Sequence, residues 1–300
     1  MKERSLITFT ILAQMAVGAM WAAGILHAWV TRQTGANVAD SLIDPALPII
    51  APIMIVAMLA SFFHLGTPIN AWRALANIRS SWLSREILFT ILFTGTSLVF
   101  MVMQWFEIGS TELRTAIAVA PALCGLGLII SMANVYQLRT VPAWNTRLTL
   151  VSFFITACLL GTSLVGVMLI VVLDNMHPGQ LFVLITRYKL SPDALFNAIA
   201  LNTIVLIAIE FMVIRQWLAK MKAGPEASIQ SAVKITREHG SIFRLRIALA
   251  LVGLVAAMLL ALSNERTAII FFTVTAFGSI VIAEVLGRVL FYAARVRSGV

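Results

Sequence analysis

Residues 148–173, LTLVSFFITACLLGTSLVGVMLIVVL, form a run of 26 residues without a charged side chain. An α-helix rises about 1.5 Å per residue, so roughly 20 such residues cross the ~30 Å hydrocarbon core of a bilayer. The run does not alternate polar and apolar residues, and it is about twice as long as a strand of a membrane barrel. It therefore predicts a membrane-spanning helix.

Seven further apolar stretches of similar length flank this one. They cover residues 6–29, 43–63, 87–106, 115–137, 195–217, 246–263 and 267–292. Hydrophobic residues make up 60% of the chain, charged residues only 12%, and the mean hydropathy is +0.95. A chain with so few charges cannot cover a water-facing surface. We predict an all-α polytopic membrane protein, an eight-transmembrane-helix bundle that forms a single domain over residues 1–300.

The basic residues divide unequally between the two faces of such a bundle. Eight spans put both termini on one face, here called side A, together with loops 64–85, 138–147 and 218–245. Side A carries 16 lysines and arginines and the opposite face, side B, carries 5. Because loops rich in Lys and Arg stay in the cytoplasm, we predict a protein of the bacterial inner membrane with both termini cytoplasmic. An acidic partner docked on side A is the alternative explanation, and both can hold together.

Polar residues inside the spans concentrate near side A. Gln14, Glu86, Glu210, Glu284 and Arg288 all fall in the half of their helix nearer that face. Charges in hydrocarbon are costly and usually functional, so this convergence predicts a polar pocket. Glu284 and Arg288 are four residues apart on one helix face and are expected to pair. The alternative is a set of snorkelling and inter-helix contacts that binds no ligand.

Metal or haem chemistry is not expected in this protein. Its two cysteines, Cys124 and Cys158, lie in apolar runs and are too few for an iron–sulfur cluster or a structural zinc site. A transmembrane haem needs two histidines at matching depth on facing helices, and the four histidines offer no such pair. The sequence also has no phosphate-binding loop and no dinucleotide-binding motif.

Four motifs, in order along the sequence, resemble the dimethyl sulfoxide reductase membrane anchor family. They are His64-Leu65-Gly66-Thr67-Pro68 with Ala71, Leu83-Ser84-Arg85-Glu86-Ile87, Thr140-Val141-Pro142-Ala143-Trp144, and Glu284-Val285-Leu286-Gly287-Arg288 followed by Phe291-Tyr292. Gln14 extends the resemblance into the first span. The resemblance therefore covers essentially the whole chain.

This resemblance implies an eight-helix anchor without a redox centre of its own. Such an anchor holds a four-cluster iron–sulfur subunit and a molybdopterin catalytic subunit at the membrane, and it exchanges electrons with a quinone, ubiquinone or menaquinone. The family's essential quinone-site histidine falls on His64 and its acidic partner on Glu86. With the polar residues near side A, the predicted quinone pocket comprises Gln14, His64, Gly66, Pro68, Glu86, Tyr136, Glu284 and Arg288.

The predicted chemistry agrees with these residue types. Oxidation of a quinol releases two protons and two electrons. A histidine can accept a hydrogen bond from a quinol hydroxyl and titrates near neutral pH, and a carboxylate at the membrane edge can pass the proton to water. The iron–sulfur subunit is expected to dock on the basic side A, close to the pocket.

The charge bias departs from the family's usual pattern. In the family's dimethyl sulfoxide reductases side A faces outward, whereas here it is predicted to face the cytoplasm. The favoured assembly is therefore a cytoplasm-facing sulfite dehydrogenase, which passes electrons from sulfite to quinone. An outward-facing sulfoxide reductase that oxidises menaquinol is the alternative. A secondary transporter is a remote third interpretation, since it would need broken helices with polar residues near the midplane.

Overall fold

The computed structural model describes residues 2–62, 75–188 and 190–298. Within these ranges the protein is helical and contains no strand. Eight helical segments of these described ranges are long and apolar enough to cross a membrane. They span Glu3–Thr34, Ala36–Ser61, Trp82–Trp105, Thr111–Val135, Arg147–Asn175, Pro192–Lys222, Gly240–Ala261 and Arg266–Ala293. The predicted all-α, eight-helix membrane fold is confirmed.

These spans are built from the following elements. They are α1 (Lys2–Thr34), α2 (Ala36–Ile43), the 3₁₀ turn η1 (Asp44–Ala46), α3 (Leu47–Phe62), η3 (Leu75–Asn77), α5 (Trp82–Trp105), α6 (Thr111–Val135), α7 (Arg147–Asn175), α8 (Pro178–Thr186), α9 (Pro192–Lys222), α10 (Glu226–Val233), the π-helical turn η4 (Lys234–Glu238), α11 (Gly240–Ala261) and α12 (Arg266–Ala293).

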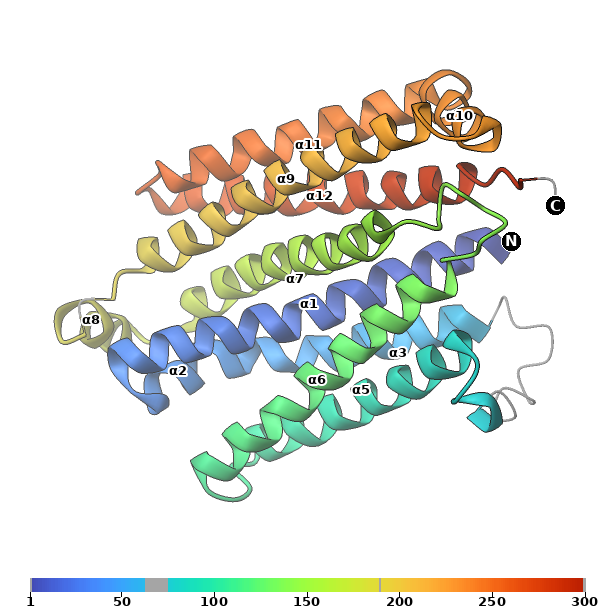
Figure 1. The fold of residues 1–300 in the computed structure, drawn as a ribbon. Coiled ribbons are helices and arrows are strands. Elements are labelled where there is room, and N and C mark those ends of the chain that lie inside the picture. The colour runs from blue at the N-terminus through green and yellow to red at the C-terminus, as the bar shows by residue number, and fades with distance from the viewer. Residues whose placement is uncertain (1, 63–74, 189, 299–300) are drawn as a thin grey trace.

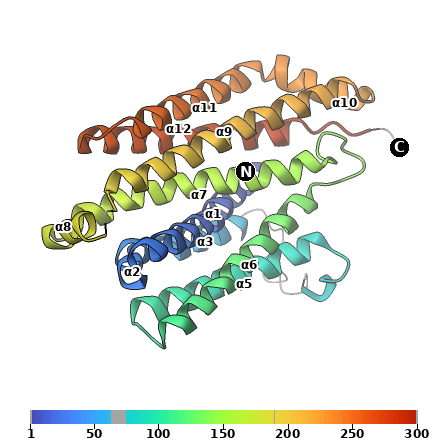
Figure 2. The same ribbon diagram turned by 60° about the vertical axis from the view of Figure 1, so that its left-hand side comes forward.

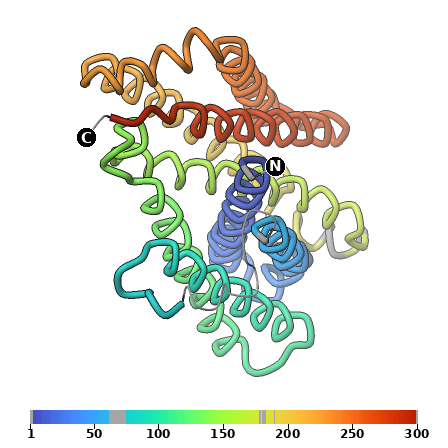
Figure 3. Tube along the Cα trace, turned by 90° about the vertical axis from the view of Figure 1, so that its right-hand side faces the viewer, coloured from blue at the N-terminus to red at the C-terminus, as the bar shows by residue number. Residues whose placement is uncertain are grey.

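The long helices lie side by side, with both termini and α10 at one end and with α2 and α8 at the other (Figure 1). The end that holds the termini is side A. Helices α1, α3 and α7 occupy the middle of the bundle, between the α5–α6 hairpin and the group formed by α9, α11 and α12 (Figure 2). Figure 3, turned so that side A faces the viewer, shows α9, α11 and α12 in the upper part, α1 and α3 below them and the α5–α6 hairpin at the bottom.

Polar caps fix where four of the spans begin. The side chains of Ser81, Ser110, Thr146 and Ser191 each accept a hydrogen bond from a backbone N–H in the first turn of α5, α6, α7 and α9. Such a cap satisfies an N–H group that has no partner within the helix. Because of the Ser81 cap, α5 begins at Trp82 rather than at the predicted residue 87. Glu86 therefore lies inside a helix and not at its opening.

Two other predicted boundaries are wrong. The second span, predicted over 43–63, already begins at Ala36 with α2, and Pro45 lies in the turn η1 that joins α2 to α3. Predicted loop 218–245 is mostly helical, because α9 continues to Lys222 and α11 begins at Gly240, with α10 and η4 between them. Short polar helices of this kind lack the long apolar run on which the prediction depended.

The centre of the bundle depends on a close contact between α1 and α7. A Cβ atom placed on Gly18 would lie 1.7 Å from the carbonyl oxygen of Ala157, and one on Gly161 would lie 1.9 Å from the carbonyl carbon of Gly18. The two backbones therefore touch where both residues are glycine. Small residues spaced four apart, such as Ala157 and Gly161, commonly form helix contacts in membranes. This contact holds α1, and with it Gln14, against α7.

Candidate functional site

Arg288 occupies the centre of the polar region near side A. Its side chain lies on α12, and only 4% of the residue is exposed. One guanidinium nitrogen donates a hydrogen bond to Oε1 of Gln14 on α1, at 2.6 Å, and the guanidinium lies 3.9 Å from the ring centroid of Phe153 on α7. Gln14 in turn donates to the carbonyl oxygen of Phe153, at 3.1 Å. Three helices are thus joined through one buried cation.

The expected pair between Glu284 and Arg288 does not form among the described contacts. Glu284 instead accepts a hydrogen bond from the hydroxyl of Thr156 on α7, at 2.6 Å. Arg288 points toward α1 and α7, where it contacts Gln14 and the face of the Phe153 ring. Residues four apart on a helix are neighbours, yet contacts with other helices decide which way two long side chains turn. The prediction of this pair was therefore wrong.

A buried ion pair joins α9 to α11. Arg246 donates a hydrogen bond to Oε1 of Glu210, at 2.6 Å. Their side chains are 14% and 8% exposed, so the pair is largely removed from solvent. Gly287 makes room for it, because a Cβ atom there would lie 2.7 Å from the guanidinium carbon of Arg246. Arg246 is one of the 16 cations counted on side A from the sequence, and the structure places it in the second turn of α11, paired with Glu210 inside the bundle.

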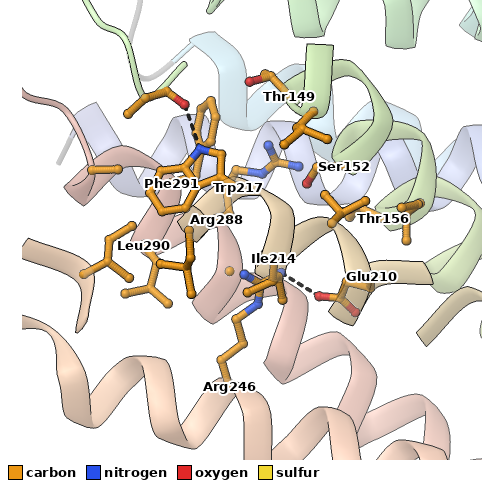
Figure 4. Close-up of a pocket in the computed structure, with 18 of the residues that line it drawn as sticks. Thr149, Ser152, Thr156, Glu210, Ile214, Trp217, Arg246, Arg288, Leu290 and Phe291 are labelled. Carbon is orange, nitrogen blue, oxygen red and sulfur yellow. Dashed lines mark hydrogen bonds and ion pairs between the residues drawn. The ribbon is translucent and has the colours of Figure 1, made fainter. Parts of the chain in front are cut away.

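These residues line a cavity of about 100 Å³ between α7, α9, α11 and α12. Figure 4 shows Glu210 and Arg246 joined across it, with Arg288, Thr156 and Trp217 arranged around the same space. The indole N–H of Trp217 donates to the carbonyl oxygen of Ala143 and ties the loop after α6 to α9. The cavity has charged groups of both signs on otherwise apolar walls.

An aromatic cluster covers Arg288 on the side-A end. Its members are Tyr136, Trp144, Phe153, Phe291 and Tyr292, with neighbouring ring centroids 5.3–6.3 Å apart. The Tyr136 and Tyr292 hydroxyls are hydrogen-bonded to each other at 2.7 Å. The Trp144 indole N–H donates to the carbonyl oxygen of Phe291, at 2.7 Å. The cluster holds the loop between α6 and α7 against the end of α12.

Tyr136 lies at the C-terminal cap of α6, beyond the membrane-spanning segment. Burial raises the pKa of its phenol well above the ordinary value, and the neighbouring Tyr292 and Glu86 act in the same direction. Tyr136 is therefore a neutral hydrogen-bonding group at neutral pH. Tyr136 and Glu86 lie at the side-A ends of their helices, α6 and α5.

Glu86 is buried in the second turn of α5, with 6% of the residue exposed. No hydrogen bond or ion pair joins its carboxylate to another residue of the described ranges. A buried carboxyl group with no hydrogen-bonding or ionic partner among the described residues is a candidate for proton transfer or for binding a polar group of a ligand.

The structure describes only part of the predicted pocket. It brings Gln14 and Arg288 into contact and places both beside Tyr136 through the ring of Phe153. Glu284 lies one turn before Arg288 on α12, and both line the cavity that Glu210 also lines. His64, Gly66 and Pro68 lie outside the described residues, so their part in the pocket stays a prediction.

Sequence reasoning missed three contributors to this region. Arg246, Thr156 and Phe153 contact the polar side chains that were predicted, yet none was singled out. An acidic residue such as Glu210 inside a span requires a nearby cation or a proton, which was a usable indication of Arg246. Thr156 and Phe153 carry no comparable indication, because hydroxyl and aromatic residues are common in membrane helices.

Comparison with known proteins gives several full-length relatives. The sequence is 27% identical to one of the chains of the anaerobic dimethyl sulfoxide reductase of Haemophilus influenzae, over 97% of this protein and 94% of the relative. It is 28% identical to the YnfH chain of an anaerobic dimethyl sulfoxide reductase of Escherichia coli, with the same coverage. It is 34% identical to one of the subunits of the sulfite dehydrogenase of Allochromatium vinosum over 117 residues, 35% of this protein and 36% of the relative.

The sequence also matches, over residues 1–294, a protein family described as the DMSO reductase anchor subunit (DmsC). The match includes every described span and every polar residue of the side-A region discussed above. The full-length relatives are of the same kind. The chain therefore belongs to the DMSO reductase anchor subunit family, as the motifs around Glu86 and Arg288 predicted.

Proposed function

We propose that this membrane anchor subunit exchanges electrons between a membrane quinone and an iron–sulfur subunit bound on side A. The observation that carries the proposal is Glu86, a buried carboxyl group with no hydrogen-bond donor or cation among its described neighbours. It lies in the second turn of α5, at the side-A end of the bundle that also holds Tyr136 and Arg288, where a soluble partner can approach. A proton acceptor at such a place fits quinol chemistry.

The reaction assigns distinct roles to the residues around Glu86. A quinol bound there loses two protons and two electrons to become a quinone. The electrons pass to the iron–sulfur subunit, and the protons pass through Glu86 and the predicted His64 to water at side A. In the opposite direction the same groups supply the protons. Arg288, fixed by Gln14 and Phe153, supplies positive charge that favours an oxygen carrying partial negative charge.

The proposed partners follow from the family and from the charges of side A. An iron–sulfur subunit docks there and connects the quinone to a molybdopterin catalytic subunit. Exposed basic residues at this end, such as Lys222, Arg237 and Arg295, can attract acidic groups of that partner. We propose that segments 64–85, 138–147 and 218–245 contribute to the docking face.

Among the possible assemblies we favour a sulfite dehydrogenase that faces the cytoplasm. The support is the excess of cations on side A, which predicts a cytoplasmic location for that face. The partial match to a subunit of a sulfite dehydrogenase is compatible with this choice. The full-length matches are to proteins of dimethyl sulfoxide reductases, so an outward-facing sulfoxide reductase is the second candidate.

The test replaces the proposed proton carriers within the assembled complex. Glu86→Gln and His64→Ala are expected to lower quinone-linked turnover by about a hundredfold or more, since general acid–base groups contribute at least that much. Turnover with a redox dye that reacts directly with the partner subunits should stay unchanged. Glu112→Gln, an exposed carboxylate at the opposite end of the bundle, is the matched control and should leave both activities intact.

Two outcomes would contradict the proposal. If Glu86→Gln reduces dye-linked turnover and complex yield as much as quinone-linked turnover, Glu86 has a structural role. If all three measurements stay unchanged, the proton leaves elsewhere. The choice of assembly is tested separately, by comparing sulfite-dependent quinone reduction with quinol-dependent sulfoxide reduction in the same vesicles.

A further inference from the structure

A second and larger cavity in the described part of the protein lies at side B, far from the proposed quinone site. Its volume is about 660 Å³, and residues of α1, α2, α3, η1, α5 and α6 line it. At this end of the bundle the α5–α6 hairpin diverges from α1 and α2 (Figure 1). A volume of this size is in the range of small-molecule sites, well above the ~30 Å³ that one water occupies.

The cavity is polar at one end and apolar at the other. Along α1 its lining runs from Met20 to Arg32, a rise of about 18 Å at 1.5 Å per residue. The charged and amide residues gather toward the surface of side B and comprise His27, Arg32, Asp40, Asp44, Gln104 and Arg114. The deep end has only apolar and aromatic walls, such as Trp21 and Phe100. Ile25, 72% exposed, lies on its open side.

The polar end contains a network with charges of both signs. His27 and Asp40 are hydrogen-bonded at 2.7 Å, and Thr31 lies 3.4 Å from the other ring nitrogen of His27. Gln104 donates to Asp44, also at 2.7 Å. The guanidinium of Arg114 lies only within 4.0 Å of Asp40, which is a loose ion pair. Both aspartates of the network accept short hydrogen bonds, whereas Arg114 makes only the long contact with Asp40.

Arg114 carries an unused donor at this place. Its side chain is only 11% exposed, and its buried Nε atom has no hydrogen-bond partner among the described residues. A buried donor without an acceptor is unfavourable by about 1–3 kcal/mol, so an acceptor is expected from outside the protein. Guanidinium groups bind phosphate oxygens particularly well, because the planar fork matches them.

We infer that this cavity binds a zwitterionic glycerophospholipid, with its phosphate on Arg114, its ammonium group beside Asp40 and Asp44, and an acyl chain in the apolar slot. The polar end lies at the membrane surface and the apolar end inside the hydrocarbon, which is the arrangement of the lipid itself. Two carboxylates beside the arginine disfavour a purely anionic headgroup. An uncharged quinone would offer no opposite charge either to Arg114 or to the two carboxylates.

The role of the lipid follows from the elements around it. The α5–α6 hairpin carries Glu86 and Tyr136 at its other end, and near the cavity the indole N–H of Trp21 donates to Ala122 of α6 at 3.0 Å. A lipid wedged between α1 and α6 fills the space where these helices diverge. It therefore fixes the angle of the hairpin against the centre of the bundle.

The experiment measures which lipid stays with the full-length protein. The protein is extracted in mild detergent, washed, supplied with phosphatidylethanolamine, phosphatidylglycerol or quinone, and analysed by native mass spectrometry. We expect one phosphatidylethanolamine per protein molecule. Arg114→Gln and Asp40→Asn should each weaken its retention about tenfold or more, because each removes one charged contact. Arg187→Gln, an exposed side-B cation outside the cavity, is the matched control.

A second variant leaves the charges in place. A Cβ atom on Gly24 would meet nothing within 4 Å, and Gly24 lines the slot, so Gly24→Leu should fill it without a clash and displace the acyl chain. Gly278→Leu on α12, equally unobstructed, should have no effect. Retention of a quinone, equal retention of phosphatidylglycerol, or retention unchanged in Arg114→Gln and Gly24→Leu would each overturn the assignment, as would a protein that holds no lipid.

Discussion

Arg288 shows how a membrane protein stabilises a cation within its spans. The residue lies under an aromatic cluster. Its guanidinium donates a hydrogen bond to Oε1 of Gln14 and stacks its flat face on the ring of Phe153. An arginine is suited to this place because its planar guanidinium can donate hydrogen bonds in its plane and stack on a ring at the same time. A lysine would provide the charge without the stacking surface.

We therefore predict that Arg288→Ala lowers the free energy of unfolding by about 2–4 kcal/mol, because it removes a charged hydrogen bond and a buried cation–π contact. Arg288→Lys should lose about half as much. The measurement is denaturant unfolding of the purified protein in detergent. The control is a pair of double-mutant cycles. Arg288 should couple strongly to Gln14→Ala and weakly to Glu284→Gln. A stronger coupling to Glu284 than to Gln14 would mean that Arg288 pairs with Glu284 within α12, contrary to the structure.

The residue scale is also where sequence reasoning was least complete. It identified Gln14, Glu210, Glu284 and Arg288 as functional candidates because buried polar groups are costly in lipid. Their partners were not predictable, since Gln14 and Arg288 are 274 residues apart along the sequence. The rule that residues four apart on a helix are neighbours suggested Glu284 instead. That rule considers one helix alone and ignores acceptors on the helices packed against it.

At the scale of helices, the close contact between α1 and α7 holds the centre of the bundle together. Its backbone atoms approach so closely at Gly18 and Gly161 that no side-chain carbon fits at either position. The gain from such contacts is close packing of the backbones and their neighbours, which drives helix association in a bilayer. The loss of either glycine must push the helices apart.

Gly161→Ala is accordingly expected to destabilise the protein by about 3 kcal/mol or more, because the added methyl group would clash with backbone rather than with a flexible side chain. Gly278→Ala on α12 has open space around it and should be neutral or slightly stabilising, as alanine favours helix. Thermal unfolding followed by tryptophan fluorescence compares the two. Equal melting temperatures for both variants would refute the role of this contact.

Helices were otherwise predicted well where length decided the outcome. An uninterrupted apolar run such as 148–173 has one stable solution in a bilayer, a helix with its backbone groups satisfied internally. Helices α2 and α10 escaped prediction because eight residues with mixed polarity carry too little periodicity. The start of α5 depends on one serine cap, a local detail that hydropathy does not register.

At the scale of the whole molecule, the distribution of charge between the two ends predicts orientation. The excess of cations on side A stays large even though Arg246 is an internal residue paired with Glu210. Because short cytoplasmic loops hold the Lys and Arg residues, side A should face the cytoplasm. This orientation distinguishes the favoured sulfite-oxidising assembly from a sulfoxide reductase on the outer face.

The prediction is tested with two reporters fused after residue 300. A fluorescent protein that folds in the cytoplasm should be bright, and a phosphatase that is active only in the periplasm should be inactive. The same phosphatase inserted in the turn that contains Gly109, at side B, should be active. The opposite pattern at both positions would reverse the orientation and favour the outward-facing assembly.

The hydrogen bond between Gln14 and Arg288 also has a consequence for biosynthesis. A ribosome that adds about 5–20 residues per second makes Arg288 roughly 14–55 s after Gln14. During that interval the first helix waits in the bilayer with its amide side chain lacking its final partner. The last helix, in turn, inserts with an arginine that costs about 2.5–3.5 kcal/mol in lipid until it meets that amide. Insertion of the final span is thereby coupled to the assembly of the first, and a polypeptide that stops before α12 leaves the side chain of Gln14 without its arginine partner.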